Sequence, residues 1–282
     1  MPADPLDALQ PGDIPREPRP EFRAELRSRL VAAVRGDDAH ADTDRPTGGP
    51  VTPSWLYYFT LPTRDVDRAE RFYTELFGWR MVRNEHGTGF HVEDVQPPMG
   101  VGTNERLVPQ LWFVVNDIDA AVAAVRAHGG TADEPVVYES GAAADCRDDQ
   151  DTEFSLSVPT YDSAPVGSTK PGELFYFSMP VADGERARSF FGAVFGWTFD
   201  GAGEQGGQHV ANSKPDGGLG IGRPGHAPEL WFRVANLEGA MARVVALGGT
   251  AEHAGDGPEG RHAGCTDDQG IFFGISEPST GS

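Results

Sequence analysis

The sequence predicts an α+β protein made of two copies of one folding unit, because three segments occur twice in the same order. Residues 56–79 read LYYFTLPTRDVDRAERFYTELFGW and residues 174–197 read LFYFSMPVADGERARSFFGAVFGW, which align without a gap. A second pair of matching segments begins at Pro109 and Pro228. The third pair is CRDDQ at 146–150 and CTDDQ at 265–269. Every candidate site therefore has an internal counterpart with which it can be compared.

Each copy starts with an apolar strand that leads into a helix. In the first copy the strand covers residues 56–61, and Asp65 is suited to cap the following helix because its side chain can accept from the first free backbone N–H groups. Gly78 ends that helix, since glycine adopts the left-handed conformation of a helix terminus. In between, apolar residues recur at helical spacing, at Ala69, Phe72, Tyr73, Leu76 and Phe77.

The second half of each copy repeats the pattern. Residues 111–115 predict another strand, Asp117 caps the next helix, and Gly129 with Gly130 stops it. The final strands are predicted at 154–158 and 271–276. Between helix and final strand, the repeated Asp-Asp pairs at 148–149 and 267–268 predict turns closed by side-chain hydrogen bonds.

Composition divides the chain into an arm with a linker, a first unit, a second linker and a second unit, at residues 1–50, 51–161, 162–171 and 172–280. Within the arm, Phe22, Leu26, Leu30 and Val34 lie on one stripe and predict a short helix over residues 21–35. We expect the arm to pack on its own protein, and recruitment of a partner is the alternative.

The charge of the chain limits its partners. A net charge of −20 argues against nucleic acid and against anionic membrane surfaces, both of which attract basic proteins. No apolar run approaches the ~20 residues of a membrane span, and the N-terminus lacks a basic and then apolar signal, which predicts a cytoplasmic protein. Cys146 and Cys265 occupy equivalent positions, and we expect both to be small buried residues rather than a disulfide framework.

One segment carries a resemblance to a known family. Both copies contain Pro-x-x-Asp-x-x-Arg-Ala-x-x-Phe-(Tyr/Phe)-x-x-x-Phe-Gly-Trp after the first strand, starting at Pro62 and Pro180. This run resembles the vicinal oxygen chelate superfamily, which includes glyoxalase, bleomycin-resistance and extradiol-dioxygenase proteins, and the resemblance extends over about residues 54–278. It implies two tandem glyoxalase-like domains, each of paired βαβββ modules forming a half-open barrel around a small-molecule cavity.

The resemblance also implies where metal-using members place their ligands, on the first, fifth and last strands of a unit. These positions are Thr60, Gln110 and Ser155 in the first copy, and Ser178, Glu229 and Gly274 in the second. A divalent cation that acts as a Lewis acid needs histidine nitrogens or carboxylates at several positions. The sequence therefore predicts no metal and no other cofactor, although a shifted alignment of the last strand would admit Glu153.

Side chains alternate across a strand, so the same alignment predicts the residues that face each cavity. Aromatic walls with a few polar groups suit a planar organic ligand, and a closed core filled by the two tryptophans is the alternative. The candidate ligand-binding residues are Tyr58, Thr60, Gln110 and Trp112 in the first copy, and Tyr176, Ser178, Glu229, Trp231 and Arg233 in the second. The opposite face, with Phe59, Leu61, Leu111, Phe113 and Val115, is predicted to form core.

Three residues are candidates for catalysis. His91 and His209 are equivalent in the repeat, and a histidine in a cavity wall can transfer protons, although both can equally face solvent or backbone. Glu229 is the third, as a base or as an anchor for an amine. It lies four residues before Arg233, so an ion pair between the two is the alternative, and Arg233 can instead hold an anion.

These observations lead to two main functional hypotheses, and a third is a scaffold or regulatory protein whose N-terminal arm recruits a partner. The first is a small-molecule binding protein without the usual metal of the superfamily, for example one that sequesters a drug or antibiotic, with an aromatic or cationic ligand. The second is an enzyme, either a lyase, isomerase or oxygenase with a non-standard metal set or a metal-free acid/base catalyst. A monomer is plausible because the repeat supplies an internal two-fold pairing, and a homodimer is the alternative.

Overall fold

The computed structural model describes residues 54–84, 87–104, 106–138, 140–160, 167, 170–202, 207–221, 227–257 and 260–278. The predicted arm at residues 1–50, with its helix, lies outside these residues, as does most of the linker at 162–171. Among the described residues, no helix is both long and apolar enough to cross a membrane.

The described residues of the first repeat form nine strands and two helices, in the predicted order. In sequence they are β1 (Leu56–Thr63), α2 (Val66–Phe77), β2 (Arg80–Arg83), β3 (Gly89–Glu93), β4 (Met99–Thr103), β5 (Gln110–Val114), α3 (Ile118–Ala127), β6 (Thr131–Ala132), β7 (Val136–Tyr138), β8 (Gly141–Arg147) and β9 (Glu153–Pro159).

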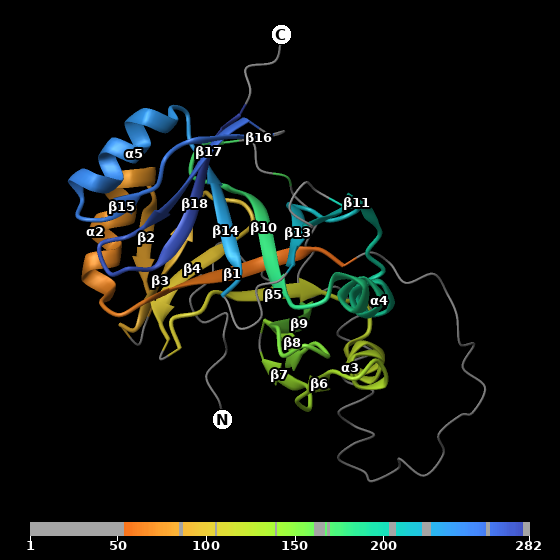
Figure 1. Ribbon diagram of the computed structural model, residues 1–282. Helices are drawn as coiled ribbons and strands as arrows, with labels where there is room; N and C mark the ends of the chain where they lie inside the picture. The colour runs from red at the N-terminus through yellow and green to blue at the C-terminus, as the bar shows by residue number, and fades with distance from the viewer. Residues whose placement is uncertain are drawn as a thin grey trace, which may run out of the picture.

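The second repeat has the same elements in the same order (Figure 1). They are β10 (Leu174–Val181), α4 (Gly184–Phe195), β11 (Phe199–Ala202), β12 (Gln208–Val210), β13 (Asp216–Ile221), β14 (Glu229–Arg233), α5 (Leu237–Ala246), β15 (Thr250–Ala251), β16 (Gly255–Gly257), β17 (Gly260–Thr266) and β18 (Phe272–Pro278).

Each repeat forms one nine-stranded sheet. The strand order is β2-β3-β4-β1-β5-β9-β8-β6 in the first sheet and β11-β12-β13-β10-β14-β18-β17-β15 in the second, with β7 and β16 added beside β8 and β17. The two βαβββ modules of a repeat join where β1 runs antiparallel to β5, and β10 to β14. The predicted α+β fold of tandem paired modules is therefore confirmed, and neither sheet closes into a barrel.

The helix ends follow the predicted local chemistry. Asp65 caps α2 by accepting from the backbone N–H groups of Asp67 and Arg68, and Asp117 caps α3 in the same way through Ala120. Gly78 ends α2 with φ at 73°, in the left-handed region that only glycine enters without strain.

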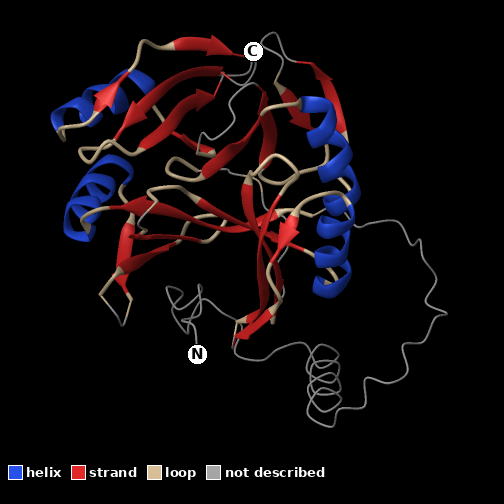
Figure 2. Cartoon of the chain, turned by 60° about the horizontal axis from the view of Figure 1, so that its bottom comes forward, coloured by secondary structure: helices blue, strands red, loops and turns tan. Residues whose placement is uncertain are grey.

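The two repeats are interlocked, because the first helix of each lies against the second module of the other. Phe72 of α2 meets Phe273 of β18, with ring centroids 6.1 Å apart, and Phe190 of α4 meets Phe154 of β9 at 6.2 Å. Figures 1 and 2 show the result, in which the helices form two pairs, α2 beside α5 and α3 beside α4.

The repeated Asp-Asp-Gln turns lock this arrangement. Gln269 accepts from the backbone N–H of Asp65 at 2.8 Å, and Gln150 accepts from that of Asp183 at 2.6 Å. Next to each glutamine, Asp268 binds Arg68 and Asp149 binds Arg186, both at 2.9 Å. Each turn therefore holds the start of a helix that belongs to the other repeat.

The first aspartate of each turn closes the turn itself, as predicted. The Asp267 carboxylate accepts from the backbone N–H groups of Gln269 and Ile271, at 2.8 and 2.9 Å, and Asp148 does the same with Gln150 and Thr152. The Tyr73 hydroxyl of α2 donates to Asp267 at 3.1 Å. Burial and the charge of Asp267 raise the pKa of Tyr73, which keeps this phenol protonated as the donor.

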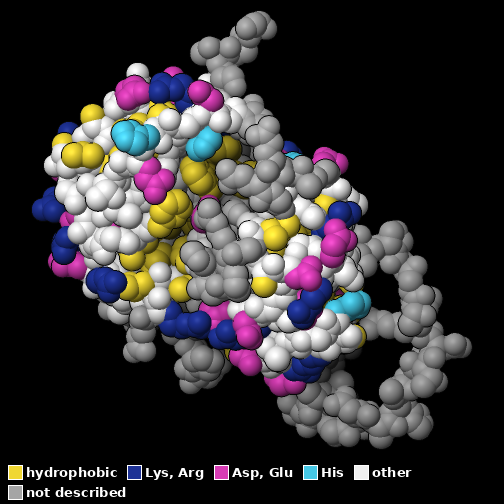
Figure 3. Space-filling model, in the orientation of Figure 1, with side chains coloured by type: hydrophobic (Ala, Val, Ile, Leu, Met, Phe, Trp, Pro, Cys, Tyr) yellow, Lys and Arg dark blue, Asp and Glu magenta, His cyan; other side chains and the backbone are white. Residues whose placement is uncertain are grey.

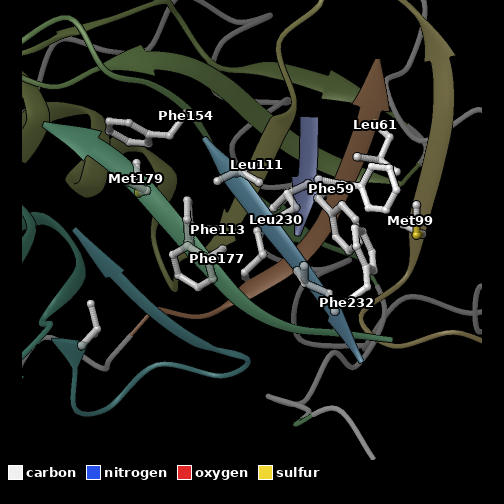
Figure 4. Close-up of a cluster of buried hydrophobic side chains, with 14 of the residues drawn as sticks. Phe59, Leu61, Met99, Leu111, Phe113, Phe154, Phe177, Met179, Leu230 and Phe232 are labelled. Atoms are coloured by element: carbon white, nitrogen blue, oxygen red, sulfur yellow. The ribbon is translucent and has the colours of Figure 1, made fainter. Parts of the chain in front are cut away.

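The core lies behind the sheets and is continuous between the repeats. The residues predicted for the core face of the first copy are all buried. Figure 4 shows how the two cores meet: Phe59 lies by Phe232, with ring centroids 6.1 Å apart, and Phe113 by Phe177 at 5.7 Å. Because the core is shared, the front faces of the sheets are what remains for a site.

The shared core leads to a stability prediction. Replacing Phe72 with Ala leaves a cavity against the other repeat and should lower the free energy of unfolding by about 3–5 kcal/mol. We expect one cooperative transition in urea, followed by tryptophan fluorescence and circular dichroism, since neither repeat keeps its core alone. The control is Val245→Ala, which is 59% exposed and should change stability by less than about 0.5 kcal/mol. Two separate transitions would contradict the shared core.

Candidate functional site

A cavity of about 550 Å³ opens on the front face of the second sheet. Its size is typical of a small-molecule site. The lining residues are Phe175, Tyr176, Ser178, His209, Asp216, Glu229, Trp231, Gly257, Gly260, His262 and Ser276. Figure 3 shows a hollow on this face with hydrophobic side chains in its wall and histidines near it. The cavity brings together five of the sequence-predicted residues, Tyr176, Ser178, His209, Glu229 and Trp231.

The strand register arranges the cavity face in rows that run across the sheet. The central row joins Tyr176 of β10, Trp231 of β14 and Gly274 of β18. A second row, toward the start of β14, joins Ser178 of β10 and Glu229 of β14. At the other end of β14, Arg233 pairs with Ser276, which pairs in turn with His262. The cavity therefore has an aromatic centre between two polar ends.

The two central aromatic side chains lean apart. A Cβ atom at Gly274 would lie 2.0 Å from the indole ring of Trp231, so this ring rests on the bare backbone of β18. A Cβ atom at Gly218 of β13 would lie 2.1 Å from the hydroxyl of Tyr176, so this side chain extends the opposite way. Since β13 and β18 flank β10 and β14 on opposite sides, the space between the two rings is the cavity.

The walls beside this centre carry the ionisable groups. His209 of β12 stacks on the Tyr176 ring, with centroids 6.2 Å apart and planes 13° from parallel. The His262 and Trp231 rings pack edge to face, with centroids 5.7 Å apart. Asp216 pairs with Tyr176 in the register, and Lys214 binds its carboxylate at 2.7 Å. Two carboxylates, of Asp216 and Glu229, thus lie in the same wall as the aromatic rings.

A β-bulge explains why one aromatic residue was missed from the sequence. The register of β10 against β14 shifts between Leu174 and Tyr176, so Phe175 and Tyr176 both line the cavity although they are consecutive. The guanidinium of Arg233 lies over the Phe175 ring, 4.6 Å from its centroid, rather than at the Glu229 end of its strand. Simple alternation excludes Phe175 from the cavity face, and only the bulge returns it there.

Two further lining residues were also missed. His262 lies on β17, as the counterpart of Ala143 when the two Cys-x-Asp-Asp-Gln segments are aligned. Asp216 begins β13, at the counterpart of Pro98. Comparison of the repeats beyond their shared motifs is the signal that could have found both.

In the first repeat, aromatic side chains fill the space between the strands that correspond to β10 and β14. Tyr58 is 0% and Trp112 is 3% exposed, and the two rings pack edge to face with centroids 5.3 Å apart. Tyr57 and Val114 complete this cluster, in which the hydroxyls of Tyr57 and Ser157 are hydrogen-bonded at 3.0 Å. For Tyr58 and Trp112 the structure therefore favours the filled core over a ligand-lined wall.

The other first-repeat candidates lie around this cluster. Gln110 is exposed and borders two polar cavities of about 490 and 190 Å³, and Thr60 is half-buried beside it on β1. Glu153 forms ion pairs with Arg106 and Arg147. His91 is 3% exposed, whereas its counterpart His209 is exposed. The histidine pair thus shares a position in the fold but not an environment.

Comparison with known proteins agrees with this architecture. Residues 55–154 match the model of the Glyoxalase/Bleomycin resistance protein/Dioxygenase superfamily, and residues 174–204 match the Bleomycin resistance protein-like N-terminal model. The matched segments of the chain belong to the glyoxalase/bleomycin resistance protein/dioxygenase superfamily.

Two relatives align over most of the chain. The anthracycline biosynthesis protein DauV of Streptomyces sp. (strain C5) is 26% identical over 81% of this chain and 94% of its own length. A putative glyoxylase, CFP32 of Mycobacterium bovis, is also 26% identical, over 81% of this chain and 95% of its own length.

Solved dioxygenases of the superfamily share the fold. The 2,2',3-trihydroxybiphenyl 1,2-dioxygenase of Sphingomonas wittichii superposes with a TM-score of 0.59 at 16% identity, over 81% of this chain and 91% of its own. The homoprotocatechuate 2,3-dioxygenase of Arthrobacter globiformis superposes with a TM-score of 0.58 at 13% sequence identity, over 82% of each chain. At these identities the likeness concerns the fold alone.

The residues at the superfamily's metal positions do not fit a divalent cation. In the first repeat the Ser155 hydroxyl donates to Asp145 at 2.6 Å, and Thr60 and Gln110 add only neutral oxygens. In the second repeat the indole of Trp231 covers Gly274, where a ligand side chain would have to start. Within the described part of the chain, no three His, Cys, Asp or Glu side chains are grouped so that they could hold a metal ion.

Neither cysteine lines the second-repeat cavity, and the burial of both gives a prediction. Both are buried, as expected from the sequence, and burial is the largest of the causes that raise the pKa of each thiol from 9.0 to about 12. The fraction of reactive thiolate at pH 8 is then about a thousandfold below that of an ordinary thiol. We expect iodoacetamide to label Cys146 and Cys265 at least about a hundredfold more slowly in the native protein than in urea, measured by mass spectrometry. Equal rates would contradict the buried positions.

Proposed function

We propose that the second-repeat cavity binds a planar aromatic small molecule without the metal of the superfamily. The observation that carries this proposal is the separation of Tyr176 and Trp231, which lean over Gly218 and Gly274 and leave a slot between aromatic surfaces. Stacking on such surfaces favours flat, unsaturated ligands. The equivalent pair in the first repeat has no such slot, because the rings contact each other.

The named relatives and the charges of the wall narrow the ligand class. One relative is named for anthracycline biosynthesis, and anthracyclines are polycyclic and planar. Glu229 and Asp216 supply carboxylates, which accept strongly from an ammonium group. We therefore propose an aromatic ligand with an amine or another donor group at the Glu229 end, and sequestration or carriage of an antibiotic-like molecule as the role.

The slot can be tested by filling it. Replacing Gly274 with Ser, the residue at the counterpart position 155, puts a Cβ atom where Trp231 now rests and should push the indole into the slot. With daunorubicin as the probe in isothermal titration calorimetry, we expect Gly274→Ser and Trp231→Ala each to weaken binding by at least about tenfold. Gln110→Ala changes a residue of the first repeat that lies outside the slot, so this variant is the control and should bind as the wild type does. Unchanged affinity in Gly274→Ser would overturn the proposal.

The role of Glu229 has its own prediction. Glu229→Gln keeps the size of the side chain and removes its charge, so an amine at this end loses a charge-assisted hydrogen bond. We expect about tenfold weaker binding of daunorubicin and no change for its N-acetyl derivative, whose nitrogen is neutral. An equal loss for both compounds would show that Glu229 does not recognise the amine.

An acid/base enzyme is the second candidate function, because His209, Glu229 and His262 line one cavity. A lyase or isomerase needs a base that removes a proton and an acid that returns it. In that case Glu229→Gln and His209→Gln lower kcat much more than they change KM, and EDTA has no effect. Bound ligand recovered unchanged after long incubation, judged by mass spectrometry, favours the binding protein instead.

A further inference from the structure

The Arg233 end of the cavity presents three polar side chains side by side. Ser276 of β18 is the register partner of Arg233 on β14 and of His262 on β17. Neighbouring strands lie about 4.8 Å apart, so the row spans roughly 10 Å from Arg233 to His262. Ser276 and His262 line the cavity, and Arg233 lies over its wall residue Phe175.

Arg233 has a donor without an acceptor. Its Nη1 atom is buried and makes no hydrogen bond to any described residue. A buried donor on a charged group is costly unless an acceptor reaches it, and Arg is always protonated. Stacking on Phe175 holds the guanidinium in place but supplies no acceptor. The missing acceptor is what an anionic ligand group would provide.

The first repeat shows the same three positions without this chemistry. There the row is Val114, Ser157 and Ala143. The Ser157 hydroxyl is used internally by Tyr57, at 3.0 Å, whereas the counterpart of Tyr57 is Phe175, which has no hydroxyl. Two positions of the row differ, because Arg233 and His262 replace the apolar Val114 and Ala143. The serine is common to both repeats, but in the second repeat it has no tyrosine hydroxyl at position 175 as a partner. These differences leave the second row with more groups that can serve a ligand.

We propose that Arg233, assisted by Ser276 and His262, binds an anionic oxygen group of the aromatic ligand, a carboxylate or a phenolate. This inference rests on the proposed function, since the aromatic part of the ligand must lie in the slot between Tyr176 and Trp231. Glu229 lies four residues from Arg233 on the same face of β14, which is about 13 Å along an extended strand. The ligand is then bipolar, with an acidic oxygen group at one end and a donor group at the other.

The test compares two flat probes that differ only in charge, anthraquinone-2-carboxylate and anthraquinone-2-carboxamide. In the wild type we expect the carboxylate to bind at least about tenfold more tightly, by isothermal titration calorimetry. Arg233→Val should remove this preference by weakening the carboxylate alone. Val is the residue at the counterpart position 114, so the strand tolerates it, and circular dichroism checks the fold.

Further variants separate the contributions. His262→Ala, which introduces the counterpart of Ala143, should reduce the preference by less than Arg233→Val does. Arg233→Lys keeps the positive charge and should retain part of the preference for the carboxylate. Arg106→Ala, a first-repeat arginine outside this cavity, should leave the preference unchanged. In the wild type, raising the salt concentration should weaken the carboxylate more than the carboxamide, a readout that needs no variant.

The outcomes distinguish the two proposals. Equal binding of both probes by the wild type, with no effect of Arg233→Val, overturns the anion site and leaves the aromatic slot standing. An unchanged preference in a folded Arg233→Val variant overturns it as well. If neither probe nor daunorubicin binds, the proposed function fails, and the anion site fails with it.

Discussion

The exchange of helices between the repeats is the constraint on which the rest of the structure depends. Each sheet has a second module whose back is covered partly by the first helix of the other repeat, through Phe72 on Phe273 and Phe190 on Phe154. The glutamines and aspartates of the repeated turns fix those helices by their first residues. Neither repeat can complete its core without the other. The backs of both sheets are therefore covered by core packing.

The front faces of the sheets are not needed to complete the shared core, and there the repeats differ. The first repeat fills its front with Tyr57, Tyr58 and Trp112, and the second keeps a cavity between Tyr176 and Trp231. This difference needs few changes. Gly257 stands where the first repeat has Tyr138, and Gly274 stands where it has Ser155. Small residues in the second repeat give the aromatic rings somewhere to lie other than on each other.

The same glycine lies at one of the metal positions that the superfamily implies. Gly274 occupies the position from which metal-using members of the superfamily offer a ligand, and the Trp231 ring rests on its backbone. A carboxylate side chain and the present indole cannot share that space. The glycine at this position and the aromatic surface of Trp231 therefore depend on each other.

The sequence by itself determined the tandem repeat, the capped helices, the α+β class and the core face, because these depend on local periodicity and on motifs that occur twice. It also selected Tyr176, Glu229 and Trp231 for a cavity face, since alternation along a strand is a local property. It did not decide whether Tyr58 and Trp112 lined or filled the equivalent space, nor did it place Phe175 or His262. Those outcomes depended on a bulge, on pairing between distant strands and on where a ring finds free volume, and only tertiary packing sets these.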